Sequence, residues 1–348
     1  MRMHAGLMGV VLVLGLLLGR PAWTAEFILE DERQSVVGQV QIVHSRWEDT
    51  LLDIARRHGI GYEEIRRANP GVDAWVPGEG TEILVPTRFV LPDVPRRGIV
   101  INLPEYRLYY FPERAAGEPQ RVITHPVSIG RMDWDTPIGL HRITEMRRNP
   151  SWRPPASVRA EAARDGRQLP AVVPPGPDNP LGSRALRLTL PSYLIHGTNR
   201  PEGVGMRVTH GCIRMYPEDV ESLYELVNVG TDVRIINQPF KVGWNGEVMY
   251  LEAHPPLEEY AEEFAERSLT VLTEMVVRGT QELAAVVDWE GAEVIAGQAR
   301  GVPAVMASLD PVSVPPAGEE VPEVLEEEAS AAAQVALDSA SVLLLDEE

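Results

Sequence analysis

The sequence is poor in lysine, cysteine and aromatic residues. Its 348 residues include 32 basic ones, of which Lys241 is the only lysine, and aromatic residues make up 6%. The single cysteine, Cys212, excludes an intramolecular disulfide, and a chain of this length needs none. The 51 acidic residues give a net charge of −19, which argues against nucleic acid as a partner, because phosphate binding requires a basic surface.

The negative charge lies almost entirely in the last third of the chain. Residues 40–237 hold 25 arginines against 24 acidic residues, whereas residues 238–348 hold 4 basic against 23 acidic residues. Between Leu257 and Val287, apolar residues at helical spacing predict a partly helical extension over residues 238–302. Residues 303–348 are rich in proline, alanine and glutamate, and we predict an acidic, disordered tail.

Residues 1–25 are typical of a secretory signal peptide. Arg2 supplies the positive charge, an apolar run follows from Leu7 to Leu18, and cleavage would fall between Ala22 and Glu26. The run is shorter than the roughly 20 residues that span a bilayer. An uncleaved N-terminal anchor remains the alternative. In either case we expect the rest of the chain to be exported, and after cleavage the mature chain would hold no integral membrane segment.

Residues 39–87 predict a small α/β unit in the order strand, helix, helix, strand. The strands are Gln41–His44 and Glu82–Val85, and the helices cover Asp49–Gly59 and Tyr62–Asn69. Asp-Thr-Leu, Ile-Ala, Asn-Pro and the final PGEGTEILVP together resemble a LysM module, although Glu48 stands where that family usually has glycine. The resemblance implies peptidoglycan binding. The alternative is a generic small packing domain.

Residues 97–237 predict a mostly β domain. Short segments rich in Val, Ile, Leu and Tyr recur along it, and a helix is expected over Pro217–Val227. Residues 147–182 are proline-rich and irregular. A loop of this length within a compact domain is usually functional, such as a lid.

The strongest candidate for catalysis is Cys212. It lies in Thr-His-Gly-Cys-Ile-Arg, 16 residues after His196, which ends a predicted strand. A thiol becomes a good nucleophile when a base or a positive charge favours the thiolate, and His196, His210 and Arg214 are nearby in sequence. Gly211 allows unusual backbone geometry before the nucleophile. The alternatives are a buried structural cysteine and a zinc site, which needs three or four ligands.

The stretches SIGRMDWDTPIG and IHGTNRPEGVGMRVTHGCIRM resemble the YkuD-type L,D-transpeptidases, specifically the ErfK/YbiS subgroup, over residues 98–237. The resemblance implies that Cys212 is the nucleophile and His196 the general base and acid. The carbonyl of Gly197 would orient the imidazole in place of a triad carboxylate. The spacer of 12 residues between His196 and Thr209 is short for the family, and Thr209 replaces the commoner serine.

The same resemblance implies roles for further residues near the nucleophile. His210 would shape the pocket, Gly211 would help to offer oxyanion N–H groups, and Arg214 would bind a substrate carboxylate. Thr198 and Thr209 complete the predicted substrate-binding set. The implied fold is a YkuD-like β-sandwich or barrel that carries the LysM-like unit and the extension.

The implied reaction is two-step acyl transfer on peptidoglycan tetrapeptide stems, without a metal or another cofactor. The acceptor would be an amine, either the terminal lysine of a lipoprotein or outer-membrane protein, or a second diaminopimelate. A hydrolase on the same scaffold and a non-catalytic peptidoglycan-binding protein remain the alternatives. We also expect that removal of residues 39–87 would leave turnover of a soluble tetrapeptide intact.

Overall fold

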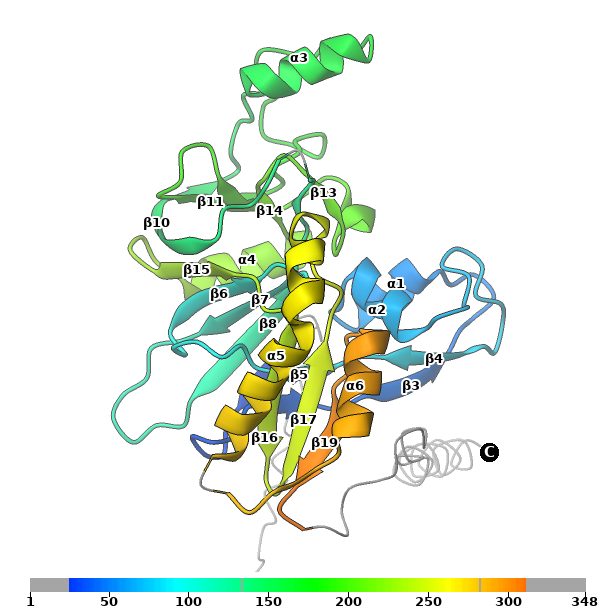
Figure 1. Ribbon diagram of the computed structural model, residues 1–348. Helices are drawn as coiled ribbons and strands as arrows, with labels where there is room; N and C mark the ends of the chain where they lie inside the picture. The colour runs from blue at the N-terminus through cyan, green and yellow to red at the C-terminus, as the bar shows by residue number, and fades with distance from the viewer. Residues whose placement is uncertain (1–24, 133, 282, 311–348) are drawn as a thin grey trace, which may run out of the picture.

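The computed structural model describes residues 25–310 except 133 and 282, and one nine-stranded sheet dominates it (Figure 1). The predicted mostly β fold is confirmed. Across this sheet the strands are β1 (Ala25–Ile28), β8 (Arg121–Pro126), β7 (Arg107–Phe111), β6 (Gly98–Asn102), β15 (Asp232–Ile236), β10 (Gly139–Arg148), β11 (Arg184–Leu188), β12 (Leu194–His196) and β14 (Ile213–Arg214).

The centre of the sheet is buried on both faces. In β6 and β7, Ile99, Ile101 and Leu108 have no exposed surface. These strands therefore read as continuous apolar runs rather than alternating ones. The helix α4 (Pro217–Leu226) contributes Val220 and Leu223 to the same core. The short strands β9 (Ile129–Gly130) and β13 (Arg207–Thr209) pair beside the sheet.

The N-terminal unit has the predicted element order. β3 (Gln41–His44) pairs with β4 (Glu82–Val85), and α1 (Leu51–Arg57) and α2 (Tyr62–Ala68) lie between them in the chain. Thr50 caps α1 in a reciprocal capping box with Asp53. The identification with LysM remains a prediction, because the order of elements does not distinguish that family from another small α/β unit.

The unit does not have a core of its own. Leu51, Ile54 and Ile65 pack in one apolar cluster with Tyr109 and Phe111 of the large sheet. Its ends are joined by β2 (Val36–Gly38) and β5 (Arg88–Val90), which pair antiparallel. Deletion of residues 39–87 would therefore expose the buried face of the sheet. The structure does not support the expectation that the deletion leaves turnover intact.

The C-terminal unit consists of a four-stranded sheet and two helices. The strands run β16 (Phe240–Asn245), β17 (Val248–Ala253), β19 (Ala304–Ser308) and β18 (Val286–Val287), covered by α5 (Ala261–Thr280) and α6 (Trp289–Gln298) (Figure 1). The predicted boundary at 302 was too early, because Met306 and Ala307 are fully buried against this sheet.

Residues 1–24 and 311–348, which hold most of the predicted signal and tail, lie outside the described residues. No helix in the described part of the chain is long and apolar enough to cross a bilayer.

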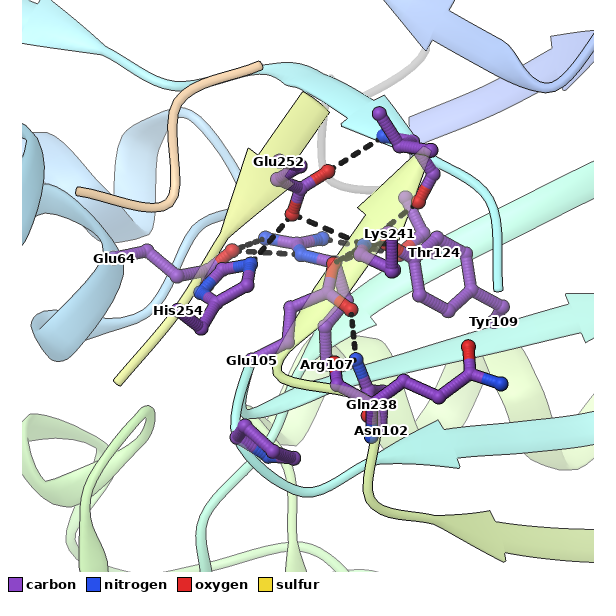
Figure 2. A network of polar contacts seen from close by, with 12 residues as sticks. Glu64, Asn102, Glu105, Arg107, Tyr109, Thr124, Gln238, Lys241, Glu252 and His254 are labelled. Atoms are coloured by element: carbon purple, nitrogen blue, oxygen red, sulfur yellow. Dashed lines mark hydrogen bonds and ion pairs between the residues drawn. The ribbon is translucent and has the colours of Figure 1, made fainter. Parts of the chain in front are cut away.

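A buried network of charged side chains joins the three units (Figure 2). Lys241 of β16 is 1% exposed, and its ammonium lies 2.8 Å from Glu105 Oε1 and 3.0 Å from Glu252 Oε1. Beside this pair, Arg107 binds Glu64 of α2 at 2.6 Å. Burial of an unpaired charge is very costly, so each ion here holds its partners in place.

Candidate active site

The sheet brings the two halves of the predicted motif together. β12 and β14 are neighbouring parallel strands, with His196 opposite Arg214 in the register. Cys212, which is half-buried, directly precedes β14. A base, a thiol and a guanidinium that are separated along the chain therefore converge at one edge of the sheet.

His196 is buried and its ring is held in one orientation. Nδ1 lies 2.6 Å from the carbonyl oxygen of Gly197, so Nδ1 carries the proton and donates it. Nε2 consequently keeps a free lone pair. Burial, reinforced by the charge of Arg214, lowers the pKa of His196 to about 3. The imidazole is therefore neutral at physiological pH, as a general base must be.

Cys212 rests as a thiol. Its Sγ donates to the carbonyl oxygen of Ser192 at 3.6 Å. Burial raises the pKa of the thiol, against the opposing effects of the Leu194 backbone N–H and the charge of Arg214. The resting pair is therefore a neutral thiol and a neutral imidazole. The thiolate forms when the proton is transferred to the base.

The turn before Cys212 requires glycine at position 211. Gly211 has φ +92°, and a Cβ there would lie 2.6 Å from the ring of Tyr193. The hydroxyl of Thr136 donates to the carbonyl oxygen of Gly211 at 2.9 Å and accepts from the N–H of Gly130 at 3.1 Å. Sequence reasoning did not single out Thr136, and its sequence signal was its place in the stretch SIGRMDWDTPIG.

The two predicted substrate-binding threonines use their hydroxyls within the protein. Thr209 donates to the carbonyl oxygen of Cys212 at 2.6 Å, and the hydroxyl of Thr198 accepts from the N–H of Arg200 at 2.9 Å. Thr209 thereby shapes the turn that contains Cys212. Direct contact of either threonine with substrate remains a prediction.

Arg214 supplies the unpaired positive charge of the site. Among the described residues its guanidinium has no carboxylate within ion-pair distance, and its buried Nε has no hydrogen-bond partner. A planar guanidinium with free donors near Cys212 is suited to bind a carboxylate.

The proline-rich segment forms an arm that returns to the site. It contains α3 (Ala156–Arg164), where the sequence predicted irregular structure, and α3 projects beyond the end of the sheet (Figure 1). From α3, Glu161 contacts His210 Nε2 at 2.5 Å and Arg131 at 2.8 Å. Arg131 and then His210 lower the pKa of Glu161 to about 2, so the carboxylate is charged. The ring of Trp134 packs edge-on against His210.

We expect Glu161→Gln to lower kcat/KM for a tetrapeptide roughly tenfold, because the arm loses its charged contact with His210 in the turn before Cys212. Thermal unfolding should change little, since Glu161 is partly exposed and its ion pairs contribute little to stability. The matched control is Asp165→Asn, directly after α3, whose carboxylate binds the exposed Arg167 at 2.9 Å. Equal kinetics for the two variants would show that the Glu161 contact is not used.

The zinc alternative gains no support from the geometry. His196 Nδ1 already contacts the carbonyl oxygen of Gly197, and His210 Nε2 already contacts the carboxylate of Glu161. Within the described ranges, the group of potential metal ligands is instead Glu105, Glu252 and His254, at the buried network. The ammonium of Lys241 lies between those two carboxylates and already supplies the positive charge.

Comparison with known proteins places the chain in a family. The YkuD model, described as the L,D-transpeptidase catalytic domain, matches residues 96–235. The chain is 44% identical over 216 residues to the probable L,D-transpeptidase YcfS of Escherichia coli, covering 60% of this chain and 66% of that protein. It is 39% identical over 249 residues to the probable L,D-transpeptidase YbiS of Escherichia coli, covering 70% of this chain and 80% of that protein.

Solved structures show a weaker likeness. An L,D-transpeptidase from Mycobacterium tuberculosis has a TM-score of 0.29 at 18% identity, over 46% of this chain and 64% of that one. The catalytic domain of the Enterococcus faecium enzyme has a TM-score of 0.31 at 18% identity, over 42% of this chain and 100% of that one. The sequence relatives carry the assignment. The chain belongs to the YkuD family of L,D-transpeptidases and within it to the ErfK/YbiS subgroup.

Proposed function

We propose that the protein cleaves and transfers peptidoglycan stem peptides through a thioester on Cys212. The pairing of β12 with β14 carries the proposal, because it sets the neutral base His196 against the segment that holds the thiol and Arg214. Membership of an L,D-transpeptidase family supports the reaction class. The chemistry needs no metal or organic cofactor.

The first step forms the acyl-enzyme. His196 Nε2 takes the thiol proton, and Sγ bonds to the carbonyl carbon that joins diaminopimelate to the terminal D-alanine of a tetrapeptide. Backbone N–H groups of Gly211 and Cys212 stabilise the oxyanion, while Arg214 holds a substrate carboxylate. The C–N bond then breaks as His196 returns the proton to the leaving amine, and D-alanine departs.

The second step resolves the thioester. An acceptor amine attacks the carbonyl carbon, gives a proton to His196, and displaces Sγ. The thiol is regenerated as it regains that proton. A thioester suits this transfer, because sulfur is a better leaving group than an alkoxide toward amines.

The reaction takes place in the periplasm in this proposal. The signal-like segment 1–25 supports export, and the relatives named above come from a bacterium with an outer membrane. The N-terminal unit, with its LysM-like pattern, would hold the enzyme on peptidoglycan. The acceptor would be the terminal lysine of a lipoprotein or outer-membrane protein, or a second diaminopimelate.

A mass-spectrometric assay tests the activity and the acceptor together. The purified protein is incubated with a disaccharide-tetrapeptide, alone and with a lysine-terminated peptide. We expect release of D-alanine and a product joined through an amine, either to the lysine peptide or to a second muropeptide. A shortened tripeptide as the sole product would identify a hydrolase, and an unchanged substrate would indicate a non-catalytic wall-binding protein.

A further inference from the structure

The N-terminal unit contacts a loop that leads into the active site. The loop, residues 199–206, connects the His196 segment to β13 and so to Cys212. At the start of α2, Tyr62 N–H donates to the carbonyl oxygen of Val204 at 3.2 Å, and Glu63 N–H donates to that of Gly205 at 3.2 Å. Main-chain hydrogen bonds between segments so distant in sequence fix the loop directly to the unit.

The two segments approach closely because each has a glycine at the point of contact, Gly61 and Gly205. A Cβ at Gly61 would lie 2.7 Å from Gly205 Cα, and a Cβ at Gly205 would lie 2.4 Å from the nitrogen of Tyr62. Cβ atoms do not approach backbone so closely, so a side chain at either position would push the two segments apart.

The contact is one part of a wider interface with the catalytic domain. Arg56 of α1 binds Glu218 of α4 through two hydrogen bonds of 2.9 and 3.0 Å. Glu64 of α2 accepts from the N–H of Gly61 at 2.6 Å and binds the buried Arg107. The start of α2 is thus held from several sides and forms a rigid support for the loop.

On its other side the loop lies against Ser128 and Arg214. Ser128 Oγ donates to the carbonyl oxygen of Gly203 at 2.7 Å, and Ser128 exchanges two backbone hydrogen bonds with Arg214. A Cβ at Gly203 would lie 3.6 Å from the guanidinium of Arg214. A displacement of the loop would therefore also move Arg214 and the turn before Cys212.

We propose that the N-terminal unit is a positioning element of the active site, acting through Gly61 and the loop 199–206. The proposal rests on the function proposed above and extends it. The unit sets the geometry of Arg214 and Cys212 even for a substrate too small to touch it. Its contribution to turnover is then separate from any contribution to wall binding.

Gly61→Ala is the sharpest test. Gly61 has φ −93°, which alanine adopts without strain, so the added methyl acts through its contacts and not through the backbone. The tightest of these is with Gly205 Cα at 2.7 Å, and Glu64 Oε2 and Pro126 Cβ would lie at 3.1 and 3.3 Å. With a soluble disaccharide-tetrapeptide, we expect KM to rise about tenfold, because the carboxylate-binding cation is displaced. The matched control is Gly297→Ala in α6, where a Cβ would meet nothing within 4 Å.

The single cysteine provides a second readout that does not depend on turnover. Alkylation of Cys212 by iodoacetamide, followed across pH at 25 °C, reports the surroundings of the thiol. We expect the rate at pH 7.5 to change roughly threefold in Gly61→Ala and not in Gly297→Ala. If the wild-type protein releases no D-alanine, the proposed function fails, and the alkylation profile still decides this inference.

Arg56→Gln is a milder variant in case the added methyl prevents folding. It removes the bidentate contact with Glu218 from a side chain that is 38% exposed, and should shift both readouts in the same direction by a smaller factor. If Gly61→Ala folds and its KM and alkylation rate equal those of the wild type, the proposal is overturned. If Gly61→Ala does not fold, the same result in Arg56→Gln overturns it. The interface would then serve stability alone.

Discussion

Replacement of Cys212 by alanine should abolish release of D-alanine from a tetrapeptide, lowering kcat by about 10⁴-fold or more. No other residue replaces the thiol, because it is the only cysteine in the chain. The protein should remain folded, since the change removes one sulfur atom from a half-buried position. The measurement is D-alanine release, together with the mass of the protein after incubation with substrate.

Cys212→Ser sharpens the same test. A hydroxyl is far harder to deprotonate than a thiol, and the pKa of His196, about 3, makes that imidazole a weak base for it. We therefore expect the serine variant to be almost as inactive as the alanine variant. Ser268→Ala, at a partly exposed position of α5, is the control and should match the wild type. Near-wild-type turnover in Cys212→Ala would falsify the thioester mechanism.

The core of the site could be predicted because its parts lie close together in the sequence. His196 ends β12, Cys212 directly precedes the neighbouring strand β14, and Gly197 follows the residue that it orients. Residues that support the site from elsewhere had no such signal. Thr136 is 75 positions from Gly211, and Glu161 is 49 positions from His210. Their roles depend on long-range packing.

The fold shows the same division between local and long-range features. Capping and apolar spacing predicted α1, α2 and α4, which the structure confirms. The strand β19 lies in a proline-rich stretch whose composition suggested disorder, and it is ordered because it pairs with β17 and β18. The docking of the N-terminal unit was also missed, because backbone contacts between glycines leave no pattern of side chains.

Lys241→Met should lower the free energy of unfolding by about 3–5 kcal/mol. Methionine fills a similar volume but removes the only ammonium between Glu105 and Glu252. Lys241 also donates to the carbonyl oxygen of Val90 at 2.7 Å, so β5 loses a hydrogen bond. The two buried carboxylates would then lose the cation that binds both of them, which leaves Glu252 with His254 at 2.6 Å. This loss is far more costly than loss of an exposed ion pair.

Urea unfolding followed by tryptophan fluorescence measures this effect. The matched control is Arg278→Met, which breaks the ion pair with Asp93, where both side chains are about two-thirds exposed, and should cost less than about 1 kcal/mol. Adding Glu252→Gln to Lys241→Met should restore part of the loss, because it removes one of the uncompensated charges. A Lys241→Met protein as stable as Arg278→Met would mean that water or neighbouring groups already neutralise the carboxylates. Restoration by Glu252→Gln, in contrast, would identify this lysine as the internal counter-ion that holds the three units of the enzyme together.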